Sequence, residues 1–232
     1  MRKIAFFVEG LTERLFLEKL LRAIFAVKHI AIEIGRIRGG TTIPITITTI
    51  STPTITSDTK YYILIYSCGG DANVRSYIQD QRQSLINSGY QKVIGIRDVY
   101  PALRAEIPML IAGLYYALPQ AQLPIIFILN VMEMEATFLA EHTHFSRINA
   151  GINPALIQAN LGFHPQNDNM ELRNMPSQDL NNSYGLVGDT YVKTDVSIDR
   201  TTNALNYAEI YFDTRGRVNS LNLLLNEIDS LF

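Results

Sequence analysis

Apolar runs alternate with segments of helical periodicity along the first part of the chain. Unbroken apolar runs, typical of strands buried on both faces, occupy residues 3–8, 61–67, 92–97 and 124–131. Each run precedes a segment with helical spacing, at residues 12–27, 73–87, 102–118 and 132–142. Because strand and helix alternate in this way, the pattern predicts an α/β fold of the Rossmann-like kind, with a mostly parallel sheet flanked by helices.

The alternation is interrupted at two places. Residues 29–37 alternate as a strand does, and a Thr-rich β insertion at 38–57 is predicted to be a hairpin or an edge excursion. From residue 143 onward Asn, Gly, Ser and Pro become frequent, and helical patterns return at 154–160, 199–212 and 218–231. The sequence therefore predicts a core at 1–142 and a C-terminal loop and helical extension at 143–232, packed on that core.

Composition and charge narrow the class of protein. Hydrophobic residues make up 47% of the chain and charged residues 18%, which is typical of a globular protein. The formal net charge is -2, so binding of nucleic acid requires a local basic patch. The single cysteine, Cys68, excludes an internal disulfide and a cysteine-based zinc site, and it favours a cytoplasmic location. The sequence shows neither a secretory signal pattern nor a membrane-spanning apolar run, so no membrane partner is expected.

Acidic residues follow three of the apolar runs. They are Glu9 and Glu13 after the first run, Asp98 after the third, and Glu133 and Glu135 after the fourth. Ligand sites in parallel sheets lie beyond the carboxyl ends of the strands, so these carboxylates are expected to gather at one edge. Oxygen ligands without His or Cys suit Mg²⁺ or Mn²⁺. Crowding should raise the pKa of some of these acids, by mutual repulsion first and burial second. Taken singly, each acid has a simpler interpretation as a helix-start or loop acid.

Three motifs stand in order at these strand ends. Glu-Gly-x-Thr-Glu at residues 9–13 lies between an apolar strand and an amphipathic helix, and this resembles the first motif of the Toprim domain of topoisomerases, bacterial primases and OLD-type nucleases. The second Toprim motif, Asp-x-Asp, is Asp-Val-Tyr here, so Tyr100 replaces an acid. The stretches "RDVYPA" and "MEMEATFLAE" are more similar to an uncharacterised bacterial Toprim-like family (domain of unknown function 4276), with Met132 in place of its usual histidine. "YVKT" and "RVNSLNLLLNEI" match more loosely.

The resemblance implies a metal-dependent phosphoryl-transfer site that uses Mg²⁺ or Mn²⁺. By position in the motifs, Glu9 is the general acid/base and Asp98 is a metal ligand. Glu133 and Glu135 supply the remaining carboxylates, so the candidate metal ligands are Glu9, Asp98, Glu133 and Glu135. The candidate catalytic residues are Glu9, Asp98 and Glu135. The candidate substrate-binding residues are Gly10, Glu13, Tyr100 and Lys193, of which Lys193 lies in "YVKT".

The expected function is therefore that of a nuclease acting on DNA or RNA. The resemblance extends this to an effector in bacterial defence against phage, with a partner protein such as a defence-system ATPase. The alternative is a catalytically degenerate Toprim-like module that binds a nucleotide or a protein, which the replacements at Tyr100 and Met132 favour. His142 and His144 are expected to be surface histidines at a helix end rather than phosphate ligands. The sequence leaves the oligomeric state open.

Overall fold

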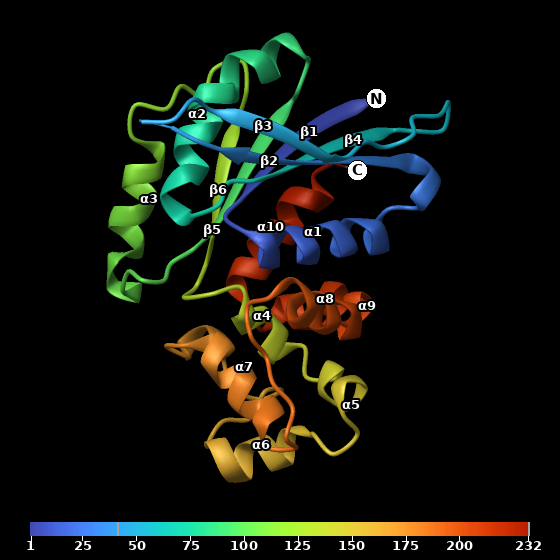
Figure 1. Cartoon of the computed structure of the whole chain (residues 1–232), viewed down its shortest axis with the longest axis vertical. Coiled ribbons are helices and arrows are strands. Elements are labelled where there is room, and N and C mark those ends of the chain that lie inside the picture. Colours follow the sequence, from blue (N-terminus) through green and yellow to red (C-terminus); the bar gives the residue numbers. More distant parts are fainter. Residues whose placement is uncertain (41, 232) are drawn as a thin grey trace. The chain divides into compact units, whose positions relative to one another are not determined.

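A mostly parallel sheet forms the core of the first part of the chain in the computed structural model (Figure 1). The structure describes residues 1–40 and 42–231, so Thr41 of the predicted insertion and Phe232 of the predicted extension lie outside the described residues. The sheet has the order β3-β2-β4-β1-β5-β6, with strands β1 (Arg2–Val8), β2 (Ile30–Arg38), β3 (Thr46–Ser51), β4 (Tyr61–Ser67), β5 (Lys92–Asp98) and β6 (Ile125–Asn130). Strand β1 pairs in parallel with β4 and β5, and β4 pairs in parallel with β2. The predicted α/β fold is confirmed.

The helices that connect the parallel strands lead toward opposite edges of the sheet. Helix α1 (Leu11–Ile24) leads from β1 to β2, and α2 (Asp71–Asn87) leads from β4 to β5 on the other side of β1. Because such crossovers are right-handed, helices that run in opposite directions cover opposite faces of the sheet. The neighbouring strands β1 and β4 therefore form the topological switch point, where ligands bind in open α/β sheets.

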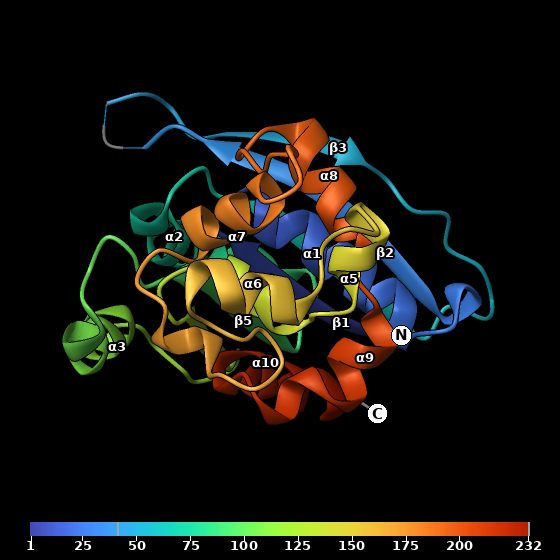
Figure 2. The same cartoon turned by 90° about the horizontal axis from the view of Figure 1, so that it is seen from below.

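The predicted β insertion contains an edge strand, whereas the third predicted helix is shorter than expected. Strand β3 pairs antiparallel with β2 at the edge of the sheet, as the edge excursion predicted (Figure 2). The helix predicted at 102–118 is shorter, because a 3-10 turn at Arg104–Glu106 precedes α3 (Ile107–Tyr115). Pro108 lies in the first turn of α3, where proline is tolerated and favours a helix start.

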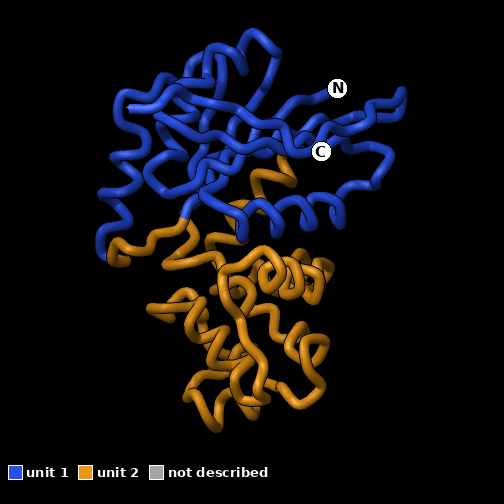
Figure 3. Tube along the Cα trace, viewed as in Figure 1, with its two compact units in different colours: residues 1–97, 105–128 blue, residues 98–104, 129–232 orange. Residues whose placement is uncertain are grey.

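The chain divides into two compact units, shown in Figure 3: residues 1–97 with 105–128, and residues 98–104 with 129–232. The first unit holds most of the sheet with α1, α2 and α3. The second unit is helical. Because the position of one unit relative to the other is not determined, the predicted packing of 143–232 on the core stays a prediction.

The second unit consists of short helices. They are α4 (Glu135–Ala140), α5 (His144–Ile148), α6 (Pro154–Leu161), α7 (Pro176–Gly185), α8 (Asp195–Ala204), α9 (Tyr207–Phe212) and α10 (Asn219–Asp229), with 3-10 turns at Met170–Leu172 and Thr214–Gly216. The helix predicted at 199–212 is broken in two. Asn206 causes the break, because its side chain accepts hydrogen bonds from the backbone N–H groups of Ala208 and Glu209 and so caps a new helix.

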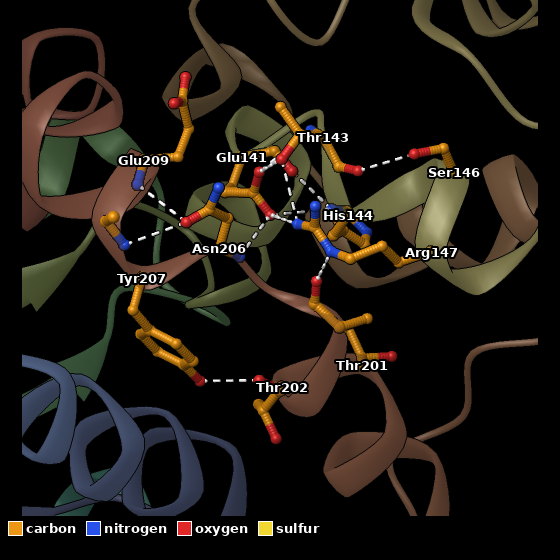
Figure 4. A network of polar contacts seen from close by, with 12 residues as sticks. Glu141, Thr143, His144, Ser146, Arg147, Thr201, Thr202, Asn206, Tyr207 and Glu209 are labelled. Atoms are coloured by element: carbon orange, nitrogen blue, oxygen red, sulfur yellow. Dashed lines mark hydrogen bonds and ion pairs between the residues drawn. The ribbon is translucent and has the colours of Figure 1, made fainter.

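A buried glutamate ties several of these helices together (Figure 4). Glu141 is fully buried, and its Oε1 accepts hydrogen bonds from both the N–H and the hydroxyl of Thr143. Its Oε2 accepts from Arg147 Nη2 at 3.2 Å and from the Asn206 N–H at 3.1 Å. The carboxylate therefore joins the end of α4 to the starts of α5 and α9.

His144 belongs to the same buried region, so the expectation of a surface histidine is wrong for it. The residue is fully buried, and its ring nitrogens lie 2.6 Å from the Glu141 carbonyl oxygen and 3.1 Å from the Tyr184 hydroxyl. Burial lowers the pKa of His144 to about 4, so the ring is neutral. His142 is half-buried, and burial also lowers its pKa.

Candidate functional site

Lys193 lies between two glutamates in the second unit. Its Nζ is 3.0 Å from Glu133 Oε1 and 3.3 Å from Glu135 Oε1. The Tyr191 hydroxyl donates a hydrogen bond of 2.7 Å to Glu135 Oε1. The second oxygen, Glu135 Oε2, is buried and has no hydrogen-bond partner among the described residues. Asp98, Glu133, Glu135 and Lys193 are called the Lys193 cluster below.

Burial and charge act against each other in the Lys193 cluster. Burial of Glu135, which is 0% exposed, raises its pKa; the charge of Glu133 adds to the rise, and Lys193 opposes it. Burial lowers the pKa of Lys193, but the charges of Glu135, Glu133 and Asp98 outweigh burial, so that its pKa is raised. A raised carboxylate pKa is confirmed for Glu135. The expectation that repulsion comes first is wrong for this residue, because burial is the larger cause.

Two further carboxylates of the cluster are held by hydrogen bonds. Glu133 accepts from Ser177 at both oxygens, at 2.8 Å from the backbone N–H and at 2.9 Å from the hydroxyl. Asp98 Oδ1 accepts from Asn130 Nδ2 at 2.9 Å and from the Met134 N–H at 3.1 Å. Asp98 ends β5, Asn130 ends β6 and Met134 precedes α4. The ends of two strands and the start of a helix therefore fix the orientation of Asp98.

The strand end also places Tyr100 and Met132 together. The Tyr100 backbone N–H donates to the Met132 carbonyl oxygen at 2.8 Å. The Tyr100 side chain is 46% exposed, whereas Met132 is buried. The ring of Tyr100 is thus accessible for a substrate contact, and the predicted contact itself stays a prediction.

Glu9, Gly10 and Glu13 lie in the first unit, at the carboxyl end of β1. The Gly10 N–H donates to Glu13 Oε2 at 2.8 Å, so this carboxylate caps α1. Capping is the helix-start interpretation that the sequence left open for Glu13. A role of Gly10 and Glu13 in substrate binding stays a prediction.

The backbone of Glu9 joins the ends of three strands. Its N–H donates to Ile96 of β5 at 3.1 Å, and its carbonyl oxygen accepts from Gly69 and Gly70, after β4, at 2.8 and 3.1 Å. Gly69 has a φ of +72°, a conformation that favours glycine. Since the two units are not placed relative to one another, convergence of Glu9 with Asp98 and Glu135 stays a prediction.

The sequence did not identify two side chains that support the cluster. Tyr191 lies two residues before Lys193 in the "YVKT" stretch, and that short spacing was an available signal. Ser177 lies within a segment without helical periodicity, and nothing in the local pattern connects it with Glu133. Only the fold brings these residues together.

The donor chemistry of the Lys193 cluster suits a divalent cation, whereas the arrangement places an ammonium group between the carboxylates. Carboxylate oxygens are preferred by Mg²⁺ and Mn²⁺, and the unpaired Oε2 of Glu135 is such a donor. In the part of the chain that the structure describes, no group of three or more His, Cys, Asp or Glu side chains is placed to hold a metal ion. A cation bound at this place would have to displace Lys193 and draw the carboxylates closer together, and metal binding stays a prediction.

Asp98→Asn and Glu135→Gln are expected to differ in their effect on stability. Asp98→Asn should lower the free energy of unfolding by about 1–2 kcal/mol, because the amide oxygen can still accept from Asn130 and Met134 but lacks the charge that strengthens both bonds. Glu135→Gln should change it by less than about 1 kcal/mol, because removing a buried charge offsets the lost attraction to Lys193. Urea unfolding in EDTA measures both variants. Equal losses would show that Glu135 is a structural acceptor like Asp98.

In the described residues no helix combines the length and apolar character needed to cross a membrane.

Comparisons with known proteins add little to this geometry. No family model and no curated protein matches the chain. A crystal structure of a "putative cell surface hydrolase" from Lactobacillus plantarum WCFS1 is similar over 59% of this chain and 56% of that chain, with 12% identity and a TM-score of 0.35. A similarity this low supports no conclusion about activity.

Proposed function

We propose that this chain hydrolyses phosphodiester bonds of DNA or RNA in a reaction that depends on Mg²⁺ or Mn²⁺, with the Lys193 cluster as its centre. One observation carries the proposal: Glu135 is fully buried beside a second glutamate and a lysine, and its Oε2 has no hydrogen-bond partner in the part of the chain that the structure describes. Burial of an incompletely paired carboxylate costs stability, and such groups concentrate at functional sites. The order of the Toprim-like motifs supports nucleic acid as the substrate.

Glu133 and Glu135, together with Asp98, would hold the cation. A bound divalent cation polarises a phosphodiester oxygen and lowers the pKa of a water molecule. Lys193, once separated from the carboxylates, supplies a positive charge that pairs with a phosphate. Glu135 Oε2 is the candidate to accept a proton, since burial raises the pKa of this side chain.

Further roles in the proposal rest on the resemblance. The resemblance gives Glu9 the role of general acid/base, and it gives the exposed ring of Tyr100 a contact with the substrate. The setting in bacterial defence and the partner ATPase belong to the same proposal and have no other support.

A specific observation favours the alternative of a module without catalytic activity. Lys193 already forms ion pairs with both Glu133 and Glu135, at 3.0 and 3.3 Å, and so offsets one of their two negative charges. An ion pair with this degree of compensation can persist as a structural element, without exchange for a cation. In that case the protein binds a nucleotide or a partner and cleaves nothing.

A cleavage assay separates the two functions. Purified protein is incubated with single-stranded DNA, double-stranded DNA or RNA in Mg²⁺, Mn²⁺ or EDTA. We expect at least one substrate to be cleaved with a cation and none in EDTA, and Glu135→Gln to reduce cleavage to the EDTA level. Glu209→Gln is the matched control, because it removes a half-buried glutamate of the same unit outside the Lys193 cluster. Cleavage by Glu135→Gln at the wild-type rate, or no cleavage of any substrate, contradicts the proposal.

A further inference from the structure

A cavity opens at the carboxyl ends of β1, β2 and β4, within the first unit. Its volume is about 220 Å³, several times the roughly 30 Å³ that a water molecule occupies in the liquid. Gly10, Leu11, Arg36, Arg38, Ser67 and Gly69 line it. Gly10 was a candidate substrate-binding residue from the sequence, whereas Leu11, Ser67 and the two arginines were not.

The position of the cavity follows from the strand order. Strands β1 and β4 are neighbours, and the helices that follow them run in opposite directions across the sheet. The loops after the two strands therefore diverge, and Gly10 and Gly69 lie at that divergence. Ligands of open α/β sheets bind at such a point, outside the carboxyl ends of the strands.

The register places both arginines and the serine on one face of the sheet. Arg36 and Val8 are each paired with Ser67 across parallel strands, so their side chains share a face, and Arg38 follows two residues later. The opposite face is covered by α2, because a Cβ on Gly95 would lie 3.0 Å from Ile78 Cδ1 of that helix. The arginines therefore lie on the face of α1.

Two arginines give the cavity positive charge. Arg36 is half-buried and Arg38 is exposed, and neither forms an ion pair with a carboxylate of residues 1–40 or 42–231. The N-terminus of the fourteen-residue helix α1 borders the same cavity, but the Glu13 carboxylate caps it, so the positive charge comes from the two arginines. Two guanidinium groups with a serine hydroxyl match the oxygens of a phosphate, to which arginine binds in a bidentate manner.

Hydrogen bonds fix the walls of the cavity. The Tyr77 hydroxyl of α2 donates to the Gly39 carbonyl oxygen at 2.6 Å and anchors the end of β2 next to Arg38. The Ser67 hydroxyl lies 3.5 Å from the Gly10 carbonyl oxygen and joins β4 to the start of α1. The positive groups are thus presented by a rigid frame rather than by a free loop.

We propose that this cavity binds a phosphate group in the backbone of a nucleic-acid strand. The inference rests on the proposed function for the identity of the strand, and it names Arg36 and Arg38 as the residues that hold it. An overall charge of -2 provides no general attraction to nucleic acid, so binding depends on a local patch of this kind.

The test measures binding in the absence of cleavage. Glu135→Gln protein in EDTA is titrated with a fluorescein-labelled single-stranded oligonucleotide at several salt concentrations. We expect Arg36→Gln and Arg38→Gln each to weaken binding about tenfold, and each to lower the slope of log K against log salt by about 0.7. Arg2→Gln is the matched control, because it removes an exposed arginine at the amino end of β1, whereas the cavity lies at the carboxyl ends of the strands. Inorganic phosphate should compete with the oligonucleotide for the parent protein and not for the double arginine variant.

The outcomes separate this inference from the proposed function. If the arginine variants bind like Arg2→Gln with an unchanged salt slope, or if the parent protein does not bind the oligonucleotide, the phosphate site is wrong. Cation-dependent cleavage by the wild type leaves the proposed function intact in either case. If the arginine variants lose binding but the wild type cleaves nothing, the phosphate site stands and the nuclease proposal fails. Thermal melting of each variant, including Arg36→Gln at its half-buried position, checks that the substitutions leave the fold unchanged.

Discussion

Lys193→Met is expected to lower the free energy of unfolding by about 2 kcal/mol at mildly alkaline pH. The substitution leaves two carboxylates, Glu133 and Glu135, without the ammonium group that lies 3.0 and 3.3 Å from them. Removing one partner of a fully buried ion pair costs roughly 3–5 kcal/mol. The expected loss is smaller because the Lys193 side chain is 45% exposed and water screens part of the charge.

The loss should depend on pH in a defined direction. Burial raises the pKa of Glu135 in the folded protein, and removal of Lys193 raises it further. An acid with a raised folded pKa destabilises the fold once pH exceeds its unfolded pKa, because the unfolded chain then ionises more readily. The deficit of Lys193→Met should therefore be largest at alkaline pH and shrink as pH falls toward the ordinary range of a glutamate. Urea unfolding across this pH range measures it.

A double variant tests whether Glu135 is the cause. Glu135→Gln in the Lys193→Met background removes the buried charge that the lysine had compensated, so it should recover much of the lost stability and flatten the pH dependence. An equal deficit of Lys193→Met at acidic and alkaline pH would indicate lost packing of the lysine stem rather than lost charge compensation.

Glu141→Ala is expected to lower the free energy of unfolding by about 3–4 kcal/mol. The side chain is fully buried and accepts four hydrogen bonds, from the Thr143 N–H and hydroxyl, Arg147 and the Asn206 N–H. Its removal leaves two backbone donors and a guanidinium group without their acceptor. Because these donors begin α5 and α9, the second unit should lose its packing as a whole.

Thr143→Val is the matched control for Glu141→Ala. It keeps the Thr143 N–H bond to the carboxylate and removes the hydroxyl, which donates to Glu141 and accepts from Arg147 at 3.0 Å, so a loss of about 1 kcal/mol is expected. Chemical unfolding followed by circular dichroism measures both variants. If Glu141→Ala costs no more than Thr143→Val, the network of Figure 4 does not hold α5 and α9 in place.

The sheet could be predicted because its strands carry a local signal. The run "YYILIYS" at 61–67 is apolar without interruption, and the glycines after Cys68 end it with a turn. A strand buried on both faces needs such a run, so its position depends little on the rest of the chain. The edge strand β3 was likewise indicated by its β-branched residues.

The second unit and its site were harder to predict. Helix α7 is mostly polar, with Leu180 and Tyr184 as its buried apolar positions, so it depends on packing rather than on its own periodicity. The glutamates were indicated by their place after a strand. Their pairing with Lys193 was not, because the lysine lies far along the chain and reaches them only through the fold. His144 was misjudged for the same reason, since its burial depends on Glu141 and Tyr184.

We propose that a divalent cation binds at the Lys193 cluster in exchange for the lysine ammonium group. Anomalous scattering from crystals soaked in Mn²⁺ tests it most directly. The account predicts an anomalous peak beside the Glu133 and Glu135 carboxylates, with Lys193 moved away from both, and no peak at that place in crystals of Glu135→Gln. Crystals soaked at a Mn²⁺ concentration that supports cleavage, but with no peak at the cluster and with Lys193 still between the two glutamates, would contradict it.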